Sequence, residues 1–258
     1  CGRCKNVSTM SLDSQALIHA DSWLNAPIDQ VDKLAIKALK REDPDQFNES
    51  FYKHFEFGTG GMLGIMLLGS NVINRYTIGQ ATQGLANALK GTSKLSVAIA
   101  CDCRINSQYF AETAANVLAA NDIDVYLFDS LRPTPLLSFA LREKGCDAGI
   151  VITASHNPKA YNGYKVYGKD GGQIVPPQDA DIIQSVRKVG IGDILWSGGQ
   201  GRIHRLGEDM DQSYINMLDS MQLTKARDLS VVFTSLHGTA ITLLPEALKR
   251  FGFSQVHV

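Results

Sequence analysis

The sequence contains no apolar run long enough to span a lipid bilayer, and its first residues do not show the pattern of a secretory signal. It also lacks an excess of charge of either sign, because acidic and basic residues leave a formal net charge of −1. A chain with almost no net charge has no general electrostatic attraction for nucleic acid or for an acidic membrane surface. We therefore expect a cytoplasmic protein that binds neither nucleic acid nor membranes.

Cysteine is scarce and is not arranged as a disulfide framework. The five cysteines are odd in number and irregularly spaced. Cys1 and Cys4 form a Cys-x-x-Cys pair, but no second pair or histidine follows nearby, so neither a zinc site nor a redox site is predicted there. Cys101 and Cys103 lie in an apolar run, where a cysteine usually acts as a small hydrophobic residue.

Helical and strand patterns alternate along the chain, and 44% hydrophobic residues among 258 are enough for a large core. Hydrophobic periodicity predicts helices over residues 27–41, 76–90 and 105–120, and strands over 95–101, 123–128 and 148–153. Residues 132–135 are expected to form a turn that leads into a helix through residue 142. Such an alternation is typical of βαβ units. The predicted fold class is α/β, with a three-layer α/β/α domain built on a mixed, largely parallel sheet.

Composition and periodicity divide the chain into four parts. We predict an N-terminal segment with one helix over residues 1–45, an α/β/α domain over 46–197, an irregular glycine-rich linker over 198–207, and the beginning of a second, similar α/β domain over 208–258. Asp43-Pro44 is expected to end the N-terminal helix. The last part is expected to contain a helix, a strand, a helix and the start of another strand, which leaves the second domain incomplete.

A polar segment, Thr153-Ala154-Ser155-His156-Asn157-Pro158, follows a predicted strand, and ligands of α/β sheets bind where strands end. Asn162-Gly163 is typical of a turn, after which residues 163–167 are expected to run back as a strand and bring Lys165 toward Ser155. The serine oxygen can accept a phosphoryl group, which a lysine can stabilise with its compact charge.

The residues alone leave two other interpretations of this segment open. One is an exposed polar hairpin without catalytic function. The other is a serine hydrolase, which is disfavoured because adjacent side chains such as Ser155 and His156 rarely face one another and because no Gly-x-Ser-x-Gly elbow is present.

The run TASHNPKAYNGYKVYGKDGGQI, which begins at Thr153, resembles the active-site loop of the α-D-phosphohexomutase superfamily, which includes phosphoglucomutases and phosphomannomutases. The resemblance covers nearly everything from about residue 47 onward and is closest to the long bacterial phosphomannomutase and phosphopentomutase-like branch. Further segments resemble the family in the same order, namely Phe57-Gly58-Thr59-Gly60-Gly61-Met62, Asp102-Cys103-Arg104, Pro133-Thr134-Pro135 and Leu236-His237-Gly238-Thr239.

This resemblance implies a phosphosugar mutase that interconverts the 1- and 6-phosphates, or the 1- and 5-phosphates, of sugars through a phosphoserine and a bisphosphate intermediate. It implies catalytic functions for Ser155, His156 and Lys165. It also implies Mg²⁺, bound by the phosphate on Ser155 and by ligands from a later part of the second domain, and an activator of the glucose 1,6-bisphosphate type. The implied substrate- and phosphate-binding residues are Thr59, Gly60, Gly61, Arg104, Asn157 and His237.

Three positions depart from the family's usual pattern. Leu63 and Val72 stand where the resemblance leads us to expect arginines, and Leu67 stands where a glycine is expected. Two lost cations in a phosphate-facing loop weaken anion binding, by about 1–3 kcal/mol for each buried charged contact. These departures keep a second hypothesis open, a relative that binds a sugar phosphate without converting it.

Overall fold

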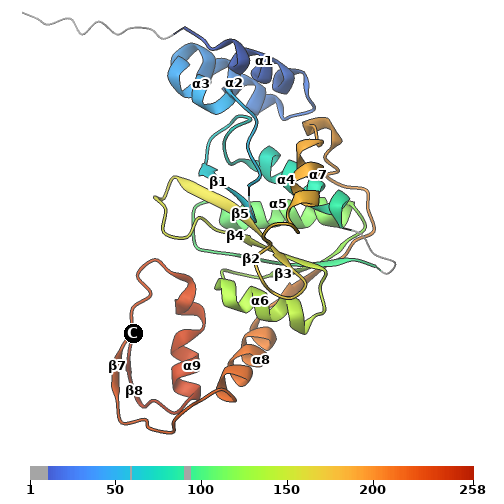
Figure 1. The fold of residues 1–258 in the computed structure, drawn as a ribbon. Coiled ribbons are helices and arrows are strands. Elements are labelled where there is room, and N and C mark those ends of the chain that lie inside the picture. The colour runs from blue at the N-terminus through green and yellow to red at the C-terminus, as the bar shows by residue number, and fades with distance from the viewer. Residues whose placement is uncertain (1–10, 59, 90–93) are drawn as a thin grey trace, which may run out of the picture.

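The computed structural model describes residues 11–58, 60–89 and 94–258. Its central element is a six-stranded sheet with the strand order β1-β5-β4-β2-β3-β6 (Figure 1). The strands β4, β2, β3 and β6 form a parallel set. β5 runs antiparallel to both of its neighbours, β4 and β1. The strands are β1 (Gly61–Ile65), β2 (Ser96–Cys101), β3 (Asp124–Phe128), β4 (Ala148–Ile152), β5 (Tyr161–Gly168) and β6 (Ile203–Leu206). The predicted α/β class with a mixed, largely parallel sheet is confirmed.

Helices cover both faces of this sheet, as Figure 1 shows. In β2, Val97 and Ile99 pack on one face and Ala98 and Ala100 on the other, because side chains alternate along a strand. All four are fully buried, as expected for a strand between two helical layers. One layer contains α4 (Arg75–Ala88), α5 (Ser107–Ala120) and α7 (Ala180–Arg187), and the other contains α6 (Thr134–Glu143) and α8 (Glu208–Asp219). None of the helices within the described ranges is long and apolar enough to cross a membrane.

The N-terminal part contains three helices where the sequence pattern predicted one. These are α1 (Ser14–Asn25), α2 (Gln30–Glu42) and α3 (Pro44–Phe51). The Asp43-Pro44 pair does end α2, but it also begins α3, since the Asp43 side chain accepts a hydrogen bond from the Gln46 amide and Pro44 occupies the first helical turn. Trp23 and Phe51 meet edge to face and belong to the same buried cluster as Tyr76 of α4. These three helices, α1 to α3, thus form a helical cap that packs onto the α/β layers.

The C-terminal part follows the predicted order of elements with one difference. Residues 198–207, predicted to be irregular, include β6, which adds a parallel edge strand next to β3. After α8 come β7 (Ser230–Val232), the short 3-10 helix η2 (Thr239–Thr242), α9 (Leu244–Arg250) and β8 (Gln255–His257), and β7 pairs in parallel with β8. The division of the chain into two domains stays a prediction.

A buried ion pair joins α8 to the main sheet. Arg132, which follows β3, donates from Nε and Nη2 to the two carboxylate oxygens of Asp211 on α8, both at 2.8 Å. The two side chains are only 8% and 13% exposed. Burial alone lowers the pKa of the Arg132 guanidinium, but the hydrogen bonds and charge of Asp211 outweigh it and raise that pKa.

We expect the substitution Asp211→Ala to lower the free energy of unfolding by about 3 kcal/mol, because it leaves the buried Arg132 charge with only the half-exposed Asp129, at 3.3 Å, as an acidic partner. Urea unfolding of the chain, followed by far-UV circular dichroism, measures the loss. The matched control is Glu112→Ala, which breaks the two-hydrogen-bond pair of Glu112 with the half-exposed Arg205. The control is expected to lose only about 1 kcal/mol or less, and equal losses for the two variants would contradict the structural importance of the buried pair.

Candidate active site

The candidate site begins where the parallel strands β2 and β4 end side by side. Asp102 follows β2 and Thr153 follows β4, and the Thr153 hydroxyl donates to Oδ2 of Asp102 at 2.6 Å. The other oxygen of Asp102 accepts from the Ser107 hydroxyl at 2.7 Å and from the Arg104 amide at 2.9 Å. A single carboxylate therefore joins the two strand ends to the first turn of α5.

Ser155 lies two residues beyond this network and is held by it. Its amide donates to the Thr153 hydroxyl oxygen at 3.0 Å. Its backbone has a φ of 53°, in the left-handed region that costs a residue with a Cβ about 1–2 kcal/mol. The Ser155 side chain is exposed, so its oxygen is presented to solvent at the end of β4. A side chain held open on a constrained backbone is suited to act as a nucleophile or a phosphoryl carrier.

His156 contacts the serine directly, contrary to the sequence-based expectation. The distance between Ser155 Oγ and His156 Nδ1 is 3.3 Å, and both residues are exposed. Adjacent side chains meet here because the left-handed turn at Ser155 replaces the extended backbone that would point them apart. A proton can pass between these two atoms with little rearrangement.

The predicted hairpin exists, but its turn lies earlier than expected. Asn162 and Gly163 belong to β5 and not to the turn, which is made within residues 155–160. The side chain of Asn162 is fully buried and donates to the Ile105 carbonyl and the Ser107 hydroxyl, which keeps it in the strand. Gly163 is required by close packing, since a Cβ there would lie 2.6 Å from the Thr153 carbonyl oxygen and 2.8 Å from that of Met62.

Lys165 lies on β5 at a position set by the strand register. It is opposite Val151 of β4 and Gly61 of β1, and it is partly buried. Val151 precedes Ser155 by four residues, about 13 Å of extended chain. The hairpin thus places the backbone of Lys165 beside the last residues of β4, one strand away from the chain that leads to Ser155.

The glycine-rich segment before β1 has a structural explanation in this fold. Gly60 and Gly61 have φ values of 71° and 148°, and a Cβ on Gly61 would lie 2.0 Å from the Tyr164 carbonyl oxygen. These glycines let β1 approach β5, and Val166 donates its amide to the Gly60 carbonyl. Thr59, the third predicted phosphate-binding residue of this segment, lies outside the described residues, as do Cys1 and Cys4.

The two positions where arginine was expected differ in their surroundings. Leu63 is 49% exposed and pairs with Gly163, so it lies on the open surface beside the end of β4. Val72, by contrast, is only 6% exposed and belongs to the core, so the expectation that position 72 faces phosphate is wrong in this structure. Leu67 is partly buried, and its carbonyl accepts a hydrogen bond from Asn74, which caps α4.

His237 approaches the site from the C-terminal part of the chain. Its carbonyl accepts a hydrogen bond from the thiol of Cys103, the central residue of the Asp102-Cys103-Arg104 turn. Leu236, just before it, has a left-handed φ of 49°. The His237 ring is exposed. Cys103 is exposed as well, unlike Cys101, whose burial raises the pKa of its thiol to about 12, so only Cys101 acts as a small core residue.

The described residues near Ser155 do not make a magnesium site by themselves. Magnesium prefers several oxygen ligands in octahedral geometry. The carboxylate close to the serine loop is Asp102, and its oxygens are already occupied by Thr153, Ser107 and Arg104. No group of three metal-ligating side chains is found within the described ranges. The donors present among the described residues therefore do not fit a complete site.

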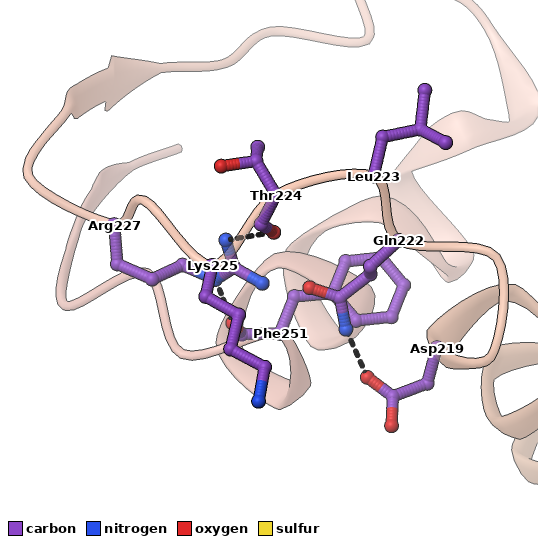
Figure 2. A pocket seen from close by; sticks show the side chains of 7 residues that line it. All are labelled: Asp219, Gln222, Leu223, Thr224, Lys225, Arg227 and Phe251. Carbon is purple, nitrogen blue, oxygen red and sulfur yellow. Dashed lines mark hydrogen bonds between the residues drawn. The ribbon is translucent and has the colours of Figure 1, made fainter.

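A separate cavity lies in the C-terminal part of the chain. Figure 2 shows it between the segment after α8 and the end of α9, with Lys225, Arg227 and Phe251 in its lining. Its volume is about 630 Å³. Arg227 donates to the carbonyls of Thr224 and Ala226, so its guanidinium serves the loop that forms the wall. None of the predicted site residues lines this cavity.

Sequence reasoning missed the residues that position the serine. The sequence pattern identifies Asp102 only as part of a motif, and Thr153 only as the residue at a strand end. Ser107 and Asn162 were not predicted as members of the site. A polar residue directly after each of two strands was the available signal, since the ends of neighbouring parallel strands meet.

Comparison with known proteins agrees with this geometry. Residues 54–190 match the family described as phosphoglucomutase/phosphomannomutase, alpha/beta/alpha domain I. The phosphoglucomutase of Staphylococcus epidermidis strain RP62A is 38% identical over 238 residues, which are 88% of this chain and 43% of that protein. The phosphoglucomutase of Staphylococcus aureus strain N315 is 38% identical over 236 residues, 88% of this chain and 42% of that protein.

Solved structures give the same result for the fold. A phosphoglucomutase/phosphomannomutase family protein from Burkholderia thailandensis matches with a TM-score of 0.59 and 25% identity, over 78% of this chain and 42% of that one. A structure from Thermus thermophilus matches with a TM-score of 0.69 and 24% identity, over 80% of this chain and 45% of that one. This second match shows similarity of fold alone.

The fold, the serine loop and these matches define the class: the chain belongs to the phosphoglucomutase/phosphomannomutase family, that is, to the α-D-phosphohexomutase superfamily. Within that family it corresponds to domain I, preceded by a helical cap and followed by a further α/β segment. The chain spans less than half the length of the curated relatives that it matches.

We expect Gly163→Ala to separate β1 and β4 from β5 and so to loosen the end of the sheet under the serine loop, because the added methyl group has no space between two carbonyl oxygens. The free energy of unfolding should fall by about 1–3 kcal/mol, measured by urea titration. Gly192→Ala is the control, because its backbone is not left-handed and the nearest atom to the added Cβ, Cδ of Pro27, lies 3.9 Å away. A Gly163→Ala loss no larger than the control loss would show that close packing does not explain this glycine.

Proposed function

We propose that this chain provides the phosphoserine domain of a phosphosugar mutase, with Ser155 as the phosphoryl carrier. The observation that supports it most is the geometry of Ser155: an exposed hydroxyl at the end of β4, on a left-handed backbone whose amide is held by Thr153. Membership of the family agrees with this proposal. The activity of the whole protein and its sugar-phosphate substrate are parts of the same proposal.

The proposed reaction is a transfer between two oxygens. A sugar hydroxyl attacks the phosphorus of phosphoserine 155, a new phosphorus–oxygen bond forms to the sugar, and the bond from phosphorus to Ser155 Oγ breaks. The hydroxyl proton ends on Ser155 Oγ, so atoms and charge balance. The bisphosphate then reorients in the site, and its other phosphoryl group is transferred to Ser155 by the reverse of this step. Catalysis of such a transfer depends mainly on positioning and on stabilisation of charge.

The neighbouring residues have distinct proposed functions in this step. His156, with Nδ1 at 3.3 Å from Ser155 Oγ, returns the proton to the leaving serine oxygen. Lys165 supplies positive charge from β5. The proposed binding residues for the sugar or its phosphates are Asn157, through its side-chain amide, Thr59, Gly60, Gly61 and His237, through its ring.

The proposal also includes two small molecules that are not part of the chain, a magnesium ion and a bisphosphate activator. Mg²⁺, when bound, supplies charge neutralisation to the transferred phosphoryl group, and the phosphate of Ser155 offers it one oxygen. An activator of the glucose 1,6-bisphosphate type supplies the first phosphoryl group to a serine that starts unmodified. Neither changes the functions proposed for the residues above.

We expect the chain to gain one phosphoryl group on Ser155 when it is incubated with glucose 1,6-bisphosphate and magnesium. Intact-mass measurement detects the gain, and peptide mapping locates it. Ser155→Ala should abolish the gain, because no hydroxyl remains at that position, while Ser254→Ala, exposed in the loop before β8, should leave it unchanged. Modification at other residues only, or none in the wild-type chain, would contradict the proposal that Ser155 is a competent carrier.

The exposure of Leu63 favours a second candidate function, binding of a sugar phosphate without conversion. Under the mutase proposal, Leu63→Arg places a cation on the open surface beside Gly163 and should raise the apparent affinity for glucose 1,6-bisphosphate about tenfold, the value of one charge-assisted contact. The concentration dependence of Ser155 phosphorylation measures this gain, and Ile18→Arg, exposed on α1 away from the serine loop, is the control. Binding of the bisphosphate by calorimetry without any phosphorylation, in the wild type and in Leu63→Arg, would favour the non-catalytic function.

A further inference from the structure

The guanidinium of Arg104 is directed at the backbone of the serine loop and not at open solvent. Its Nη2 donates to the carbonyls of Ser155 at 2.7 Å and Asn157 at 2.6 Å. Its Nη1 donates to the carbonyls of Pro158 at 3.0 Å and Tyr161 at 3.1 Å. One side chain from the turn after β2 thus binds four carbonyls spread along the connection between β4 and β5.

These contacts use every donor on the two terminal nitrogens of the guanidinium. An arginine offers five N–H groups in a fixed plane. Four of them face the carbonyls, and the fifth, on Nε, is buried and lies 3.4 Å from Oδ2 of Asp102 without forming a hydrogen bond. The Arg104 side chain is 12% exposed. No pair of N–H groups on Arg104 is therefore open to a phosphate, although phosphate binding is the function that the family resemblance implied for this residue.

The carbonyls that Arg104 binds lie in a stretch with few partners of its own. Within residues 154–161 the backbone bonds to itself through the Asn157 amide to the Ala154 carbonyl and the Tyr161 amide to the Pro158 carbonyl. Pro158 has no N–H to contribute. A loop of this kind depends on side chains to satisfy and fix its backbone.

Ser155 is consequently held from both sides of its Cα. Thr153, itself held by Asp102, accepts from the Ser155 amide, and Arg104 donates to the Ser155 carbonyl. These two contacts fix the peptide groups on either side of a residue whose φ of 53° is unfavourable without support. One contact comes from Arg104 and the other from Thr153, which Asp102 holds in turn, so residues after two neighbouring strands of the sheet set the direction of the serine hydroxyl.

We infer that Arg104 is a positioning residue that orients the Ser155 hydroxyl by binding the backbone of its loop, and not a ligand of the substrate phosphate. This inference rests on the proposed function of Ser155 for its consequence, but its geometric basis is independent of it. A lysine keeps the positive charge but has one nitrogen with three donors, which cannot span four carbonyls. Charge and positioning are therefore separable by Arg104→Lys.

Arg104→Lys should lower the maximal rate of Ser155 phosphorylation by glucose 1,6-bisphosphate about tenfold to a hundredfold, the effect of misplacing a reacting group by about 1 Å. The half-saturating concentration should change less than about twofold, because no substrate contact is lost. Arg205→Lys, on the half-exposed β6 ion pair, is the control and should leave both constants unchanged. A raised half-saturating concentration with an unchanged maximal rate would overturn the inference in favour of phosphate binding.

Limited trypsin digestion tests the same inference without any reaction. Lys159 is exposed in the loop that Arg104 binds, and cleavage after it should become at least about fivefold faster in Arg104→Lys as the loop is released. Cleavage after Arg205, within β6 of the main sheet, reports opening beyond the loop and should not change. Unchanged cleavage after Lys159, or an equal increase at both positions, would overturn the inference. If the wild-type chain is not phosphorylated, the function proposed for Ser155 fails, while the digestion result still decides whether Arg104 holds the loop.

Discussion

The geometry of the candidate site depends on the carboxylate of Asp102. It accepts hydrogen bonds from Thr153, Ser107 and the Arg104 backbone, and it also lies beside the Arg104 guanidinium. Through these four groups it joins the end of β2, the end of β4, the start of α5 and the serine loop. Because these groups share one carboxylate, loss of Asp102 would leave several partly buried donors without an acceptor at once.

The antiparallel strand β5 adds a second constraint. It lies between β1 and β4, and it returns the chain from the serine loop along the strand that precedes it. Its register determines which residues lie near the serine: Gly163 where three strands approach closely, and Lys165 two positions farther along. The same register brings Leu63 of β1 to the exposed surface beside the site. The chemistry of the site is therefore decided by strand pairing as much as by the serine segment itself.

The remaining elements support this arrangement from a distance. The N-terminal helices bury Trp23 and Phe51 against α4, and the Arg132–Asp211 pair joins α8, which packs on α6, to the loop after β3. Beyond α8, the loop at His237 comes back to the turn at Cys103. The backbone of His237 therefore lies beside the Asp102-Cys103-Arg104 turn.

The sequence by itself determined the α/β alternation, the mixed sheet, the serine at the end of a strand and the family to which the chain belongs. These follow from local periodicity and from a contiguous motif, which depend on residues close together in the chain. The tertiary structure alone decided that Asn162-Gly163 continues a strand, that residues 203–206 form an edge strand, that Val72 is buried, and that Arg104 binds carbonyls. Each of these depends on partners more than 20 residues away or on burial, and no local pattern reports such contacts, because the free energy that selects among local conformations comes from groups that only the folded chain brings together.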